Sequence, residues 1–134
     1  MSAPTCATAL VVEDQQAIRR LVVDVLGRAG YIAKEAKDGA AAMRELDQSA
    51  DSIDLLVLDL SLPLVDGLEV LAHVRSKAPL LPVIAVSASR EDLAEARAAG
   101  ARETLAKPFD VSELLERVES CRRFSPRTPS DTTC

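Results

Sequence analysis

The sequence predicts an α/β fold in which helices cover both faces of a parallel β-sheet. Five short apolar runs alternate with longer amphipathic segments along the chain. The runs are unbroken, which is typical of strands buried on both faces in parallel sheets. Residues that cap helices stand where several amphipathic segments begin. This regular alternation of strand and helix predicts a doubly wound sheet.

The predicted strands recur through the chain, and most of them end at a polar residue. The first, third and fourth runs consist almost entirely of Leu, Val, Ile and Ala, whereas the second and fifth are shorter and weaker. The runs cover residues 9–12, 31–33, 55–58, 83–86 and 104–106.

The predicted helices lie between and after these strands. Apolar residues from Ile18 to Leu26 repeat at three-to-four spacing, as do those from Leu68 to Arg75, whose aliphatic stem extends the stripe. Glycines follow two of the helix patterns, and capping residues precede others. These signals are the pairs Asp66–Glu69, Ser89–Asp92 and Asp110–Glu113, the Asp38-Gly39 turn, and Gly30 and Gly100.

Length and composition limit the function classes. The chain has 134 residues and a formal net charge of −5, which fits one domain and argues against a nucleic-acid-binding surface. The three cysteines, Cys6, Cys121 and Cys134, match neither a metal site nor a disulfide framework. With no signal peptide and no long apolar run, we expect a soluble cytoplasmic protein without a membrane partner. We expect one domain over residues 8–122, with flexible termini at 1–7 and 125–134.

Polar residues follow four of the predicted strands at the point where each one ends. Glu13 and Asp14 follow the first, Asp59 the third and Ser87 the fourth, while the fifth runs into Lys107. Right-handed crossovers bring the carboxyl ends of parallel strands to one edge, where such folds bind ligands. These side chains should therefore share a pocket.

The residue types in this predicted pocket indicate phosphoryl transfer. Three converging carboxylates repel one another unless a cation joins them, and Mg²⁺ is the ion that oxygen ligands of this kind favour. Lys107 and the hydroxyl of Ser87 suit an anion beside the metal, and a carboxylate is a competent nucleophile. Alone, Asp14 would be an ordinary helix cap, Ser87 a turn residue and Lys107 a surface lysine. The joint pattern favours a site.

At these residues the sequence resembles the receiver domains of two-component response regulators, the chemotaxis-regulator-like superfamily, over residues 8–122. The similarity rests on Glu13-Asp14, the stretch from Asp59 to Gly67, and Ala106-Lys107-Pro108-Phe109, with Val86-Ser87-Ala88 between them. It implies a flavodoxin-like fold, a five-stranded sheet of order 2-1-3-4-5 flanked by five helices.

The resemblance also implies roles for individual residues. Asp59 is the phosphoacceptor, with Glu13, Asp14, Asp59 and the main-chain carbonyl of Ser61 around Mg²⁺. Lys107 pairs with Asp59 beforehand and contacts the phosphoryl oxygens afterwards, as does Ser87. Ser61 and Ser89, which are small and neutral, leave water access to the phosphoryl group open.

The implied output is a change of the surface formed by the fourth helix, fifth strand and fifth helix. Ser87 moves towards the phosphoryl group and pulls the following loop with it. The position of its usual aromatic partner is Thr104, a departure that puts the signalling route in question but leaves the chemistry intact. Phe109 is expected to serve packing, and Arg19, Arg20 and His73 to face solvent.

The implied partners are a sensor histidine kinase or a histidine phosphotransfer protein, a downstream protein target, and a second copy of the chain on phosphorylation. The domain is a signalling module that catalyses its own phosphorylation and dephosphorylation, and is not otherwise an enzyme. Since no output domain follows it in this sequence, a stand-alone regulator is the favoured interpretation over a receiver taken from a larger protein.

Three other functions fit the sequence less well. A haloacid-dehalogenase-type phosphohydrolase needs a second aspartate where Ser61 stands. A flavodoxin-like cofactor carrier needs a phosphate-binding loop after the first strand, where Glu13 and Asp14 would repel phosphate. A degenerate receiver that serves as a protein-binding scaffold draws support only from Thr104.

Overall fold

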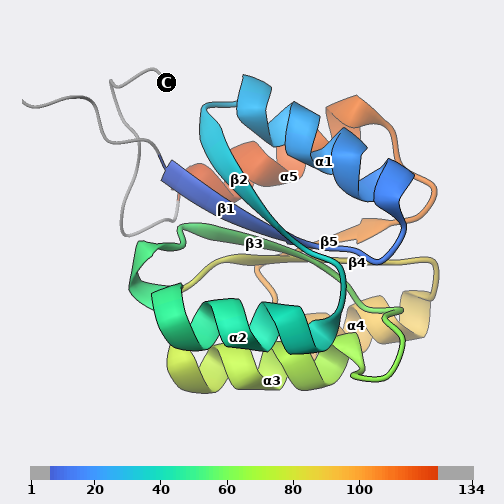
Figure 1. The fold of residues 1–134 in the computed structure, drawn as a ribbon. Helices are drawn as coiled ribbons and strands as arrows, with labels where there is room; N and C mark the ends of the chain where they lie inside the picture. Colours follow the sequence, from blue (N-terminus) through green and yellow to red (C-terminus); the bar gives the residue numbers. More distant parts are fainter. Residues whose placement is uncertain (1–6, 124–134) are drawn as a thin grey trace, which may run out of the picture.

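The computed structural model describes residues 7–123, which form a parallel sheet between two layers of helices (Figure 1). The five strands lie in the order β2-β1-β3-β4-β5, which confirms the predicted sheet of order 2-1-3-4-5. The strands are β1 (Ala7–Val12), β2 (Tyr31–Ala36), β3 (Leu55–Asp59), β4 (Val83–Ser87) and β5 (Glu103–Ala106).

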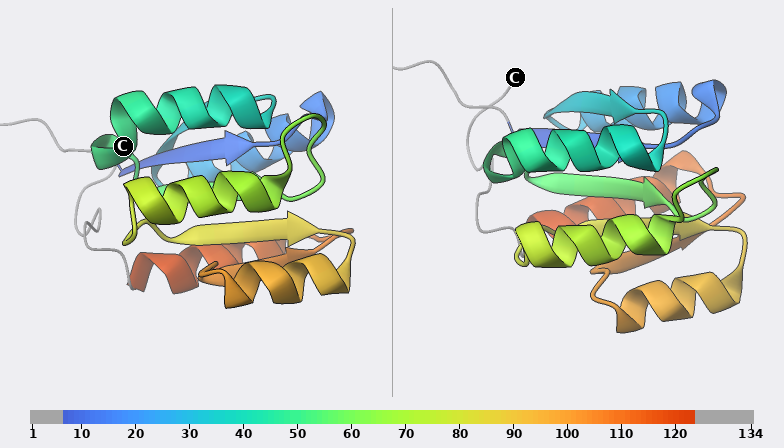
Figure 2. Two further views of the ribbon diagram at one scale, coloured as in Figure 1. Left: turned by 90° about the horizontal axis from the view of Figure 1, so that it is seen from below. Right: turned by 60° about the horizontal axis from the view of Figure 1, so that its bottom comes forward.

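Five α-helices flank the sheet, as the sequence predicted. Helices α1 and α5 cover one face, and α2, α3 and α4 cover the other (Figure 2). The helices are α1 (Gln16–Arg28), α2 (Gly39–Ser49), α3 (Gly67–Lys77), α4 (Arg90–Ala98) and α5 (Val111–Arg123), with a short 3₁₀ turn, η1 (Ala50–Ser52), before β3.

The central strands are hydrophobic on both sides because each face packs against helices. In β1, Leu10 and Val12 belong to the core beneath α2, α3 and α4, while Ala9 and Val11 belong to the core beneath α1 and α5. Burying a Leu or Val side chain stabilises the fold by roughly 1.5–3 kcal/mol. The edge strand β2 carries polar residues, which explains why its apolar run was short.

The predicted helix caps are present. Asp66 and Ser89 cap α3 and α4 by accepting hydrogen bonds from backbone N–H groups in the first turn. Before α5, the side chains of Asp110 and Glu113 each accept from the other's backbone N–H, at 2.9 and 3.1 Å, which is a complete capping box. Gly30 and Gly100 end their helices with φ of 97° and 109°.

His73 and the start of β1 differ from the predictions made from the sequence. His73 was expected to face solvent, yet its Nε2 lies 2.8 Å from Asp47 Oδ1 on α2, and 26% of its side chain is exposed. The strand β1 begins at Ala7, and the rest of the expected flexible termini, 1–6 and 125–134, lies outside the described residues. Within residues 7–123, no helix combines the length and apolar character needed to cross a bilayer.

Gly67 fixes the segment that follows β3. A Cβ atom at this position would lie 2.4 Å from the Cα of Leu60, so any other residue would displace the backbone. The Gly67 N–H also donates to the carbonyl of Leu60, at 3.3 Å. The start of α3 is thereby held against the end of β3, which sets the shape of the loop beside Asp59.

Candidate functional site

The three predicted carboxylates meet at the carboxyl edge of the sheet. Glu13 and Asp14 follow β1, and Asp59 ends β3 on the neighbouring strand. Glu13 is 4% and Asp59 3% exposed, whereas Asp14 faces solvent. Carboxylate oxygens of all three lie within 4.8 Å of one another. The sheet topology therefore brings together residues that are up to 46 positions apart in the sequence.

Lys107 joins the two buried carboxylates. It follows β5, and its Nζ lies 3.1 Å from Glu13 Oε1 and 3.3 Å from Asp59 Oδ2. The contact with Asp59 agrees with the prediction made from the sequence. The contact with Glu13 was not predicted, and it makes Lys107 the centre of a bridge between β1 and β3.

Burial and mutual repulsion shape the electrostatics of the pocket. Burial raises the pKa of Glu13 to about 7, with the nearby Asp59 carboxylate adding to the rise and the Gln15 N–H opposing it. Burial alone would lower the pKa of Lys107, but its bonds to the two acids outweigh this and raise it. One ammonium group thus balances only part of the negative charge of three acids.

The loop after β3 fixes the carboxylate oxygen of Asp59 that does not contact Lys107. The backbone N–H of Ser61 donates to Asp59 Oδ1 at 3.0 Å, while Oδ2 faces Lys107. Both carboxylate oxygens therefore have fixed partners, and the side chain has one defined orientation. Ser61 lies beside the pocket, and its carbonyl as a metal ligand stays a prediction.

Ser87 is at the end of β4 and fully buried. Its Oγ accepts a hydrogen bond from the Ser89 N–H at 3.0 Å, and the Ser89 Oγ in turn accepts from the Asp92 N–H at 3.2 Å. The hydroxyl of Ser87 is therefore tied to the loop that begins α4.

Thr104 lies on β5, three residues before Lys107, and contacts both neighbouring helices. Its Oγ1 accepts from Arg97 of α4 at 3.4 Å, and its carbonyl accepts from the Nε of Arg117 of α5 at 2.9 Å. Thr104 thus connects the three elements of the expected output surface through polar contacts.

Phe109 packs against the core on the α1 and α5 side, as predicted.

Arg19 was predicted to belong to a solvated face, and this prediction was wrong. Its side chain is only 14% exposed, donates to the carbonyl of Glu13 at 2.8 Å, and pairs with Glu35 at 2.9 Å. It braces the backbone from which Glu13 projects. The pairing crosses from α1 to β2, and no spacing in the sequence signals it.

The donor set fits a hard divalent cation. Carboxylate oxygens are preferred ligands of Mg²⁺, and two or three acids with retained waters form its usual coordination in proteins. The partly unbalanced negative charge at Glu13, Asp14 and Asp59 is what such an ion would neutralise.

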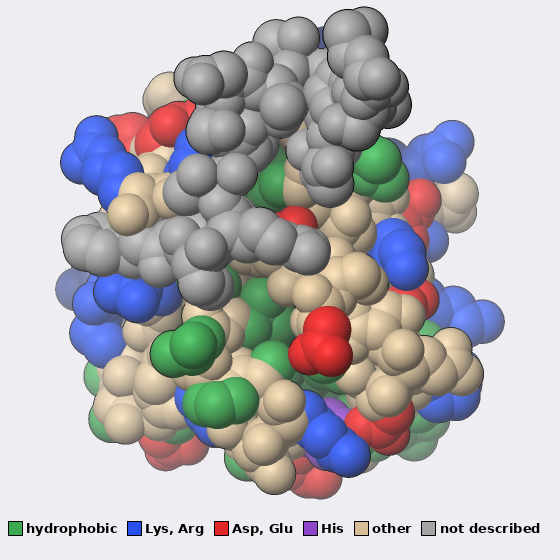
Figure 3. All heavy atoms as spheres, turned by 90° about the vertical axis from the view of Figure 1, so that its left-hand side faces the viewer, with side chains coloured by type: hydrophobic (Ala, Val, Ile, Leu, Met, Phe, Trp, Pro, Cys, Tyr) green, Lys and Arg blue, Asp and Glu red, His purple; other side chains and the backbone are tan. Residues whose placement is uncertain are grey.

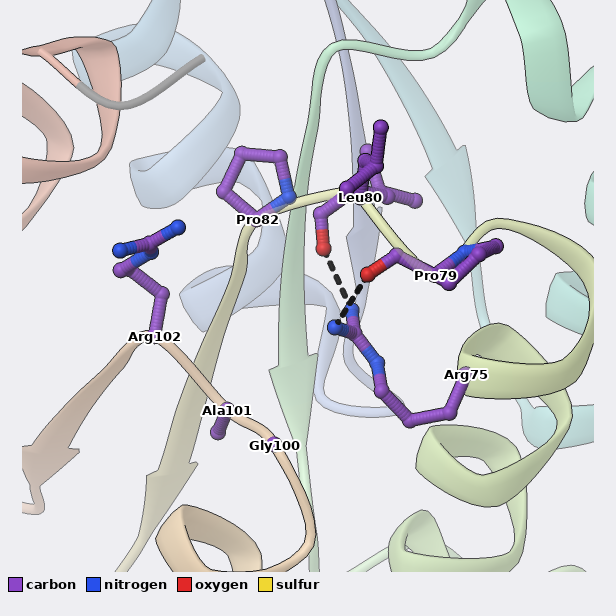
Figure 4. A pocket seen from close by; sticks show the side chains of 8 residues that line it. Arg75, Pro79, Leu80, Pro82, Gly100, Ala101 and Arg102 are labelled. Carbon is purple, nitrogen blue, oxygen red and sulfur yellow. Dashed lines mark hydrogen bonds between the residues drawn. The ribbon is translucent and has the colours of Figure 1, made fainter. Parts of the chain in front are cut away.

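A hollow of about 420 Å³ lies at the opposite, amino edge of the sheet. Figure 3 looks onto this edge, where exposed apolar side chains lie between basic and acidic groups. In the hollow, Arg75 donates to the carbonyls of Pro79 and Leu81 and so supports the loop before β4 (Figure 4). Its lining contains no carboxylate and no hydroxyl group, so the chemistry described above belongs to the carboxyl edge.

Comparisons with known proteins agree with this geometry. The family model of the response regulator receiver domain matches residues 9–119. The chain is 40% identical over 119 residues to the uncharacterized transcriptional regulatory protein YrkP of Bacillus subtilis, covering 87% of this chain and 50% of that protein. It is 37% identical over 127 residues to the response regulator MprA of Mycobacterium avium, covering 92% and 54%.

Solved structures give the same result. The chemotaxis response regulator CheY4 of Vibrio cholerae superposes with a TM-score of 0.79 at 30% identity, covering 87% of this chain and 99% of that one. The receiver domain of NtrX from Brucella abortus superposes with a TM-score of 0.78 at 30% identity, covering 84% and 96%. The chain therefore spans nearly all of these two structures but about half the length of the curated relatives.

Proposed function

The chain belongs to the family of response regulator receiver domains, and we propose that its Asp59 accepts a phosphoryl group from a histidine kinase or a histidine phosphotransfer protein. The observation that carries the proposal is the bridge of Lys107 between two buried carboxylates, with Asp14 beside them. Burying two acids next to each other costs stability, so a pocket of this kind indicates a function that needs them.

The proposed reaction forms an aspartyl phosphate. A carboxylate oxygen of Asp59 attacks the phosphorus of a phosphohistidine, a P–O bond forms and the P–N bond breaks. The electron pair stays on the imidazole nitrogen, which takes up a proton. Ser61 and Lys107 orient the Asp59 side chain for this attack, which is the positioning that phosphoryl transfer chiefly requires.

Lys107 has a second task in the proposal. Before transfer, its ammonium group donates to Asp59 Oδ2 and Glu13 Oε1. After transfer, it would donate to the phosphoryl oxygens, whose negative charge its own charge complements. Glu13, Asp14, Asp59 and the carbonyl of Ser61 would hold Mg²⁺, which supplies positive charge to the phosphoryl oxygens when bound. Ser61 and Ser89, which are small and neutral, would leave the aspartyl phosphate accessible to water. The domain is also proposed to catalyse its own dephosphorylation.

Phosphorylation would act on the output surface through Ser87. The hydroxyl gives up its bond from the Ser89 N–H and turns to the phosphoryl group, and the start of α4 moves with it. Thr104 lies on the same surface, between Arg97 and Arg117, in place of an aromatic switch residue. Apart from Thr104, nothing among the described residues favours the alternative of a degenerate scaffold, since the acids and Lys107 lie together.

The output partner is proposed to be a protein, in a cytoplasmic setting, with a homodimer as a further product of phosphorylation. YrkP is named as a transcriptional regulatory protein, and so is SphR of Synechococcus elongatus, which is 34% identical over 132 residues. This chain covers only 50% and 51% of those two proteins, so their role in transcription is not carried over to it.

Intact-mass measurement after incubation with acetyl phosphate tests the proposal. We expect a gain of one phosphoryl group with Mg²⁺, none with a chelator present, and none in Asp59→Asn. The matched control is Asp54→Asn, which changes a buried aspartate at the opposite edge and should leave phosphorylation unchanged. A folded protein that gains no phosphoryl group from acetyl phosphate or from any kinase would refute the proposal.

A further inference from the structure

Leu64 is the most exposed large apolar side chain among residues 7–123. It is 99% exposed, compared with 74% for Leu80 and 54% for Ile32. It lies in the loop between β3 and α3, five residues after Asp59. The side chain gains nothing from burial within the described part of the chain.

The backbone of Leu64 is strained as well. Its φ is 68°, the only positive value at a non-glycine residue between positions 7 and 123. The Val65 N–H donates to the carbonyl of Pro63 at 2.7 Å and closes a tight turn with Leu64 at its apex. Gly or Asn adopts this conformation at lower cost. Backbone strain of this kind clusters at active sites, ligand clamps and switch regions.

The neighbours of Leu64 hold it in place. Leu62 and Val65, on either side of the apex, pack against the core beneath α2, α3 and α4. Gly67 is pressed against Leu60 at the base of the loop. The exposed leucine is therefore presented from a fixed loop, which keeps the entropic cost of binding through it low.

The location of Leu64 indicates its partner. A protein that delivers a phosphoryl group to Asp59 must approach the carboxyl edge, where the β3–α3 loop forms part of the rim. Val111, 41% exposed, lies four residues after Lys107, where α5 begins at the same edge. Apolar side chains around a polar pocket are typical anchors of protein interfaces.

We infer that Leu64 is an apolar anchor for the protein that phosphorylates Asp59. The inference rests on the proposed function and adds a residue that determines recognition of the donor. The donor would bury Leu64 in an apolar socket next to its phosphohistidine. Small-molecule donors, which need no docking surface, would not use it.

The test compares two phosphodonors. The protein donor is the purified cytoplasmic part of a histidine kinase, chosen beforehand because it phosphorylates the wild-type chain, and the small donor is acetyl phosphate. Leu64→Asn removes the apolar side chain and relieves the strain. Leu80→Asn is the matched control, since Leu80 is also exposed but lies at the amino edge.

In Leu64→Asn we expect kcat/KM with the kinase to fall at least tenfold, mainly through a higher KM. The rate with acetyl phosphate and the melting temperature should not fall, and Leu80→Asn should match the wild type with both donors. Unchanged transfer from the kinase would overturn the inference, as would an equal loss with both donors, which would place Leu64 in the chemistry instead. Failure of the proposed function has a different signature, since the phosphoryl group on the wild-type chain would then lie on a residue other than Asp59.

Discussion

At the carboxyl edge of the sheet, two buried acids share one lysine, whereas at the amino edge a buried acid has backbone partners in fixed positions. Glu13 and Asp59 lie together around Lys107. Asp54, 7% exposed, accepts from the Thr8 N–H at 2.8 Å, and its own N–H donates to the Thr8 carbonyl at 2.7 Å. The same residue type is therefore in repulsive surroundings at one edge and in supportive surroundings at the other.

The difference shows where the fold gives up stability for chemistry. Like charges in a buried pocket weaken the folded state, and natural proteins keep them where activity requires them. Hydrogen bonds that satisfy a buried strand end strengthen it. Leu64 also lies at the carboxyl edge, and its strained backbone and exposed side chain likewise lower the stability of the fold there. The two edges should therefore respond differently to substitution, both in stability and in phosphorylation.

Lys107→Ala should have the largest effect. It leaves Glu13 and Asp59 facing each other without a cation, so we expect the free energy of unfolding in metal-free buffer to fall by about 3 kcal/mol. Urea denaturation measures this, and added Mg²⁺ should recover part of the loss. The exposed pair of Lys77 and Asp47 provides the control, since Lys77→Ala should change stability little. Equal effects of the two substitutions would contradict the bridge.

Asp54→Ala should weaken the amino edge without affecting the chemistry. The Thr8 N–H in β1 loses its acceptor, and we expect a loss of about 2 kcal/mol. Asp54→Asn keeps an acceptor oxygen and should lose less. Phosphorylation by acetyl phosphate, measured at a temperature where the variant is folded, should match the wild type. A slower reaction would mean that the two edges are coupled.

Asp59→Asn should stabilise the protein while it abolishes phosphorylation. The substitution removes one of two adjacent buried carboxylates, so we expect a gain of about 1 kcal/mol in metal-free buffer. Urea denaturation at constant pH provides the comparison with the wild type. A clear loss of stability would show that Asp59 supports the fold, as Asp54 does, and would remove the contrast between the edges.

Arg75→Met should have the smallest effect. The apolar stem of Arg75, which packs beside Gly100, is largely retained. The carbonyl of Pro79 loses a donor at an exposed site, and that of Leu81 loses one at a half-buried site. We expect the free energy of unfolding to fall by less than about 1 kcal/mol, with unchanged phosphorylation. An altered rate would indicate that the hollow at the amino edge influences the site.

Most of the fold followed from local pattern. Unbroken apolar runs identified the central strands, and the caps at Asp66, Ser89 and Asp110 identified where helices begin. The convergence of Glu13 and Asp59 followed from the rule that parallel strands end at one edge. These predictions needed no knowledge of side-chain conformation.

The details that were missed depend on how side chains reach across the fold. Lys107 contacts Glu13 across 94 positions of sequence, and Arg19 turns inward to the Glu13 carbonyl. Both are set by three-dimensional packing. The left-handed backbone at Leu64 also had no signal, because the nearest glycine, Gly67, is needed for close packing at the base of the loop.

The most direct test of the central claim is to locate the phosphoryl group. After reaction with acetyl phosphate and Mg²⁺, borohydride reduction converts an aspartyl phosphate to homoserine, which peptide mass spectrometry assigns to a position. The account predicts homoserine at position 59 alone, and none when the phosphodonor is omitted. Homoserine at Asp14, or a phosphoryl group that resists borohydride, would contradict it.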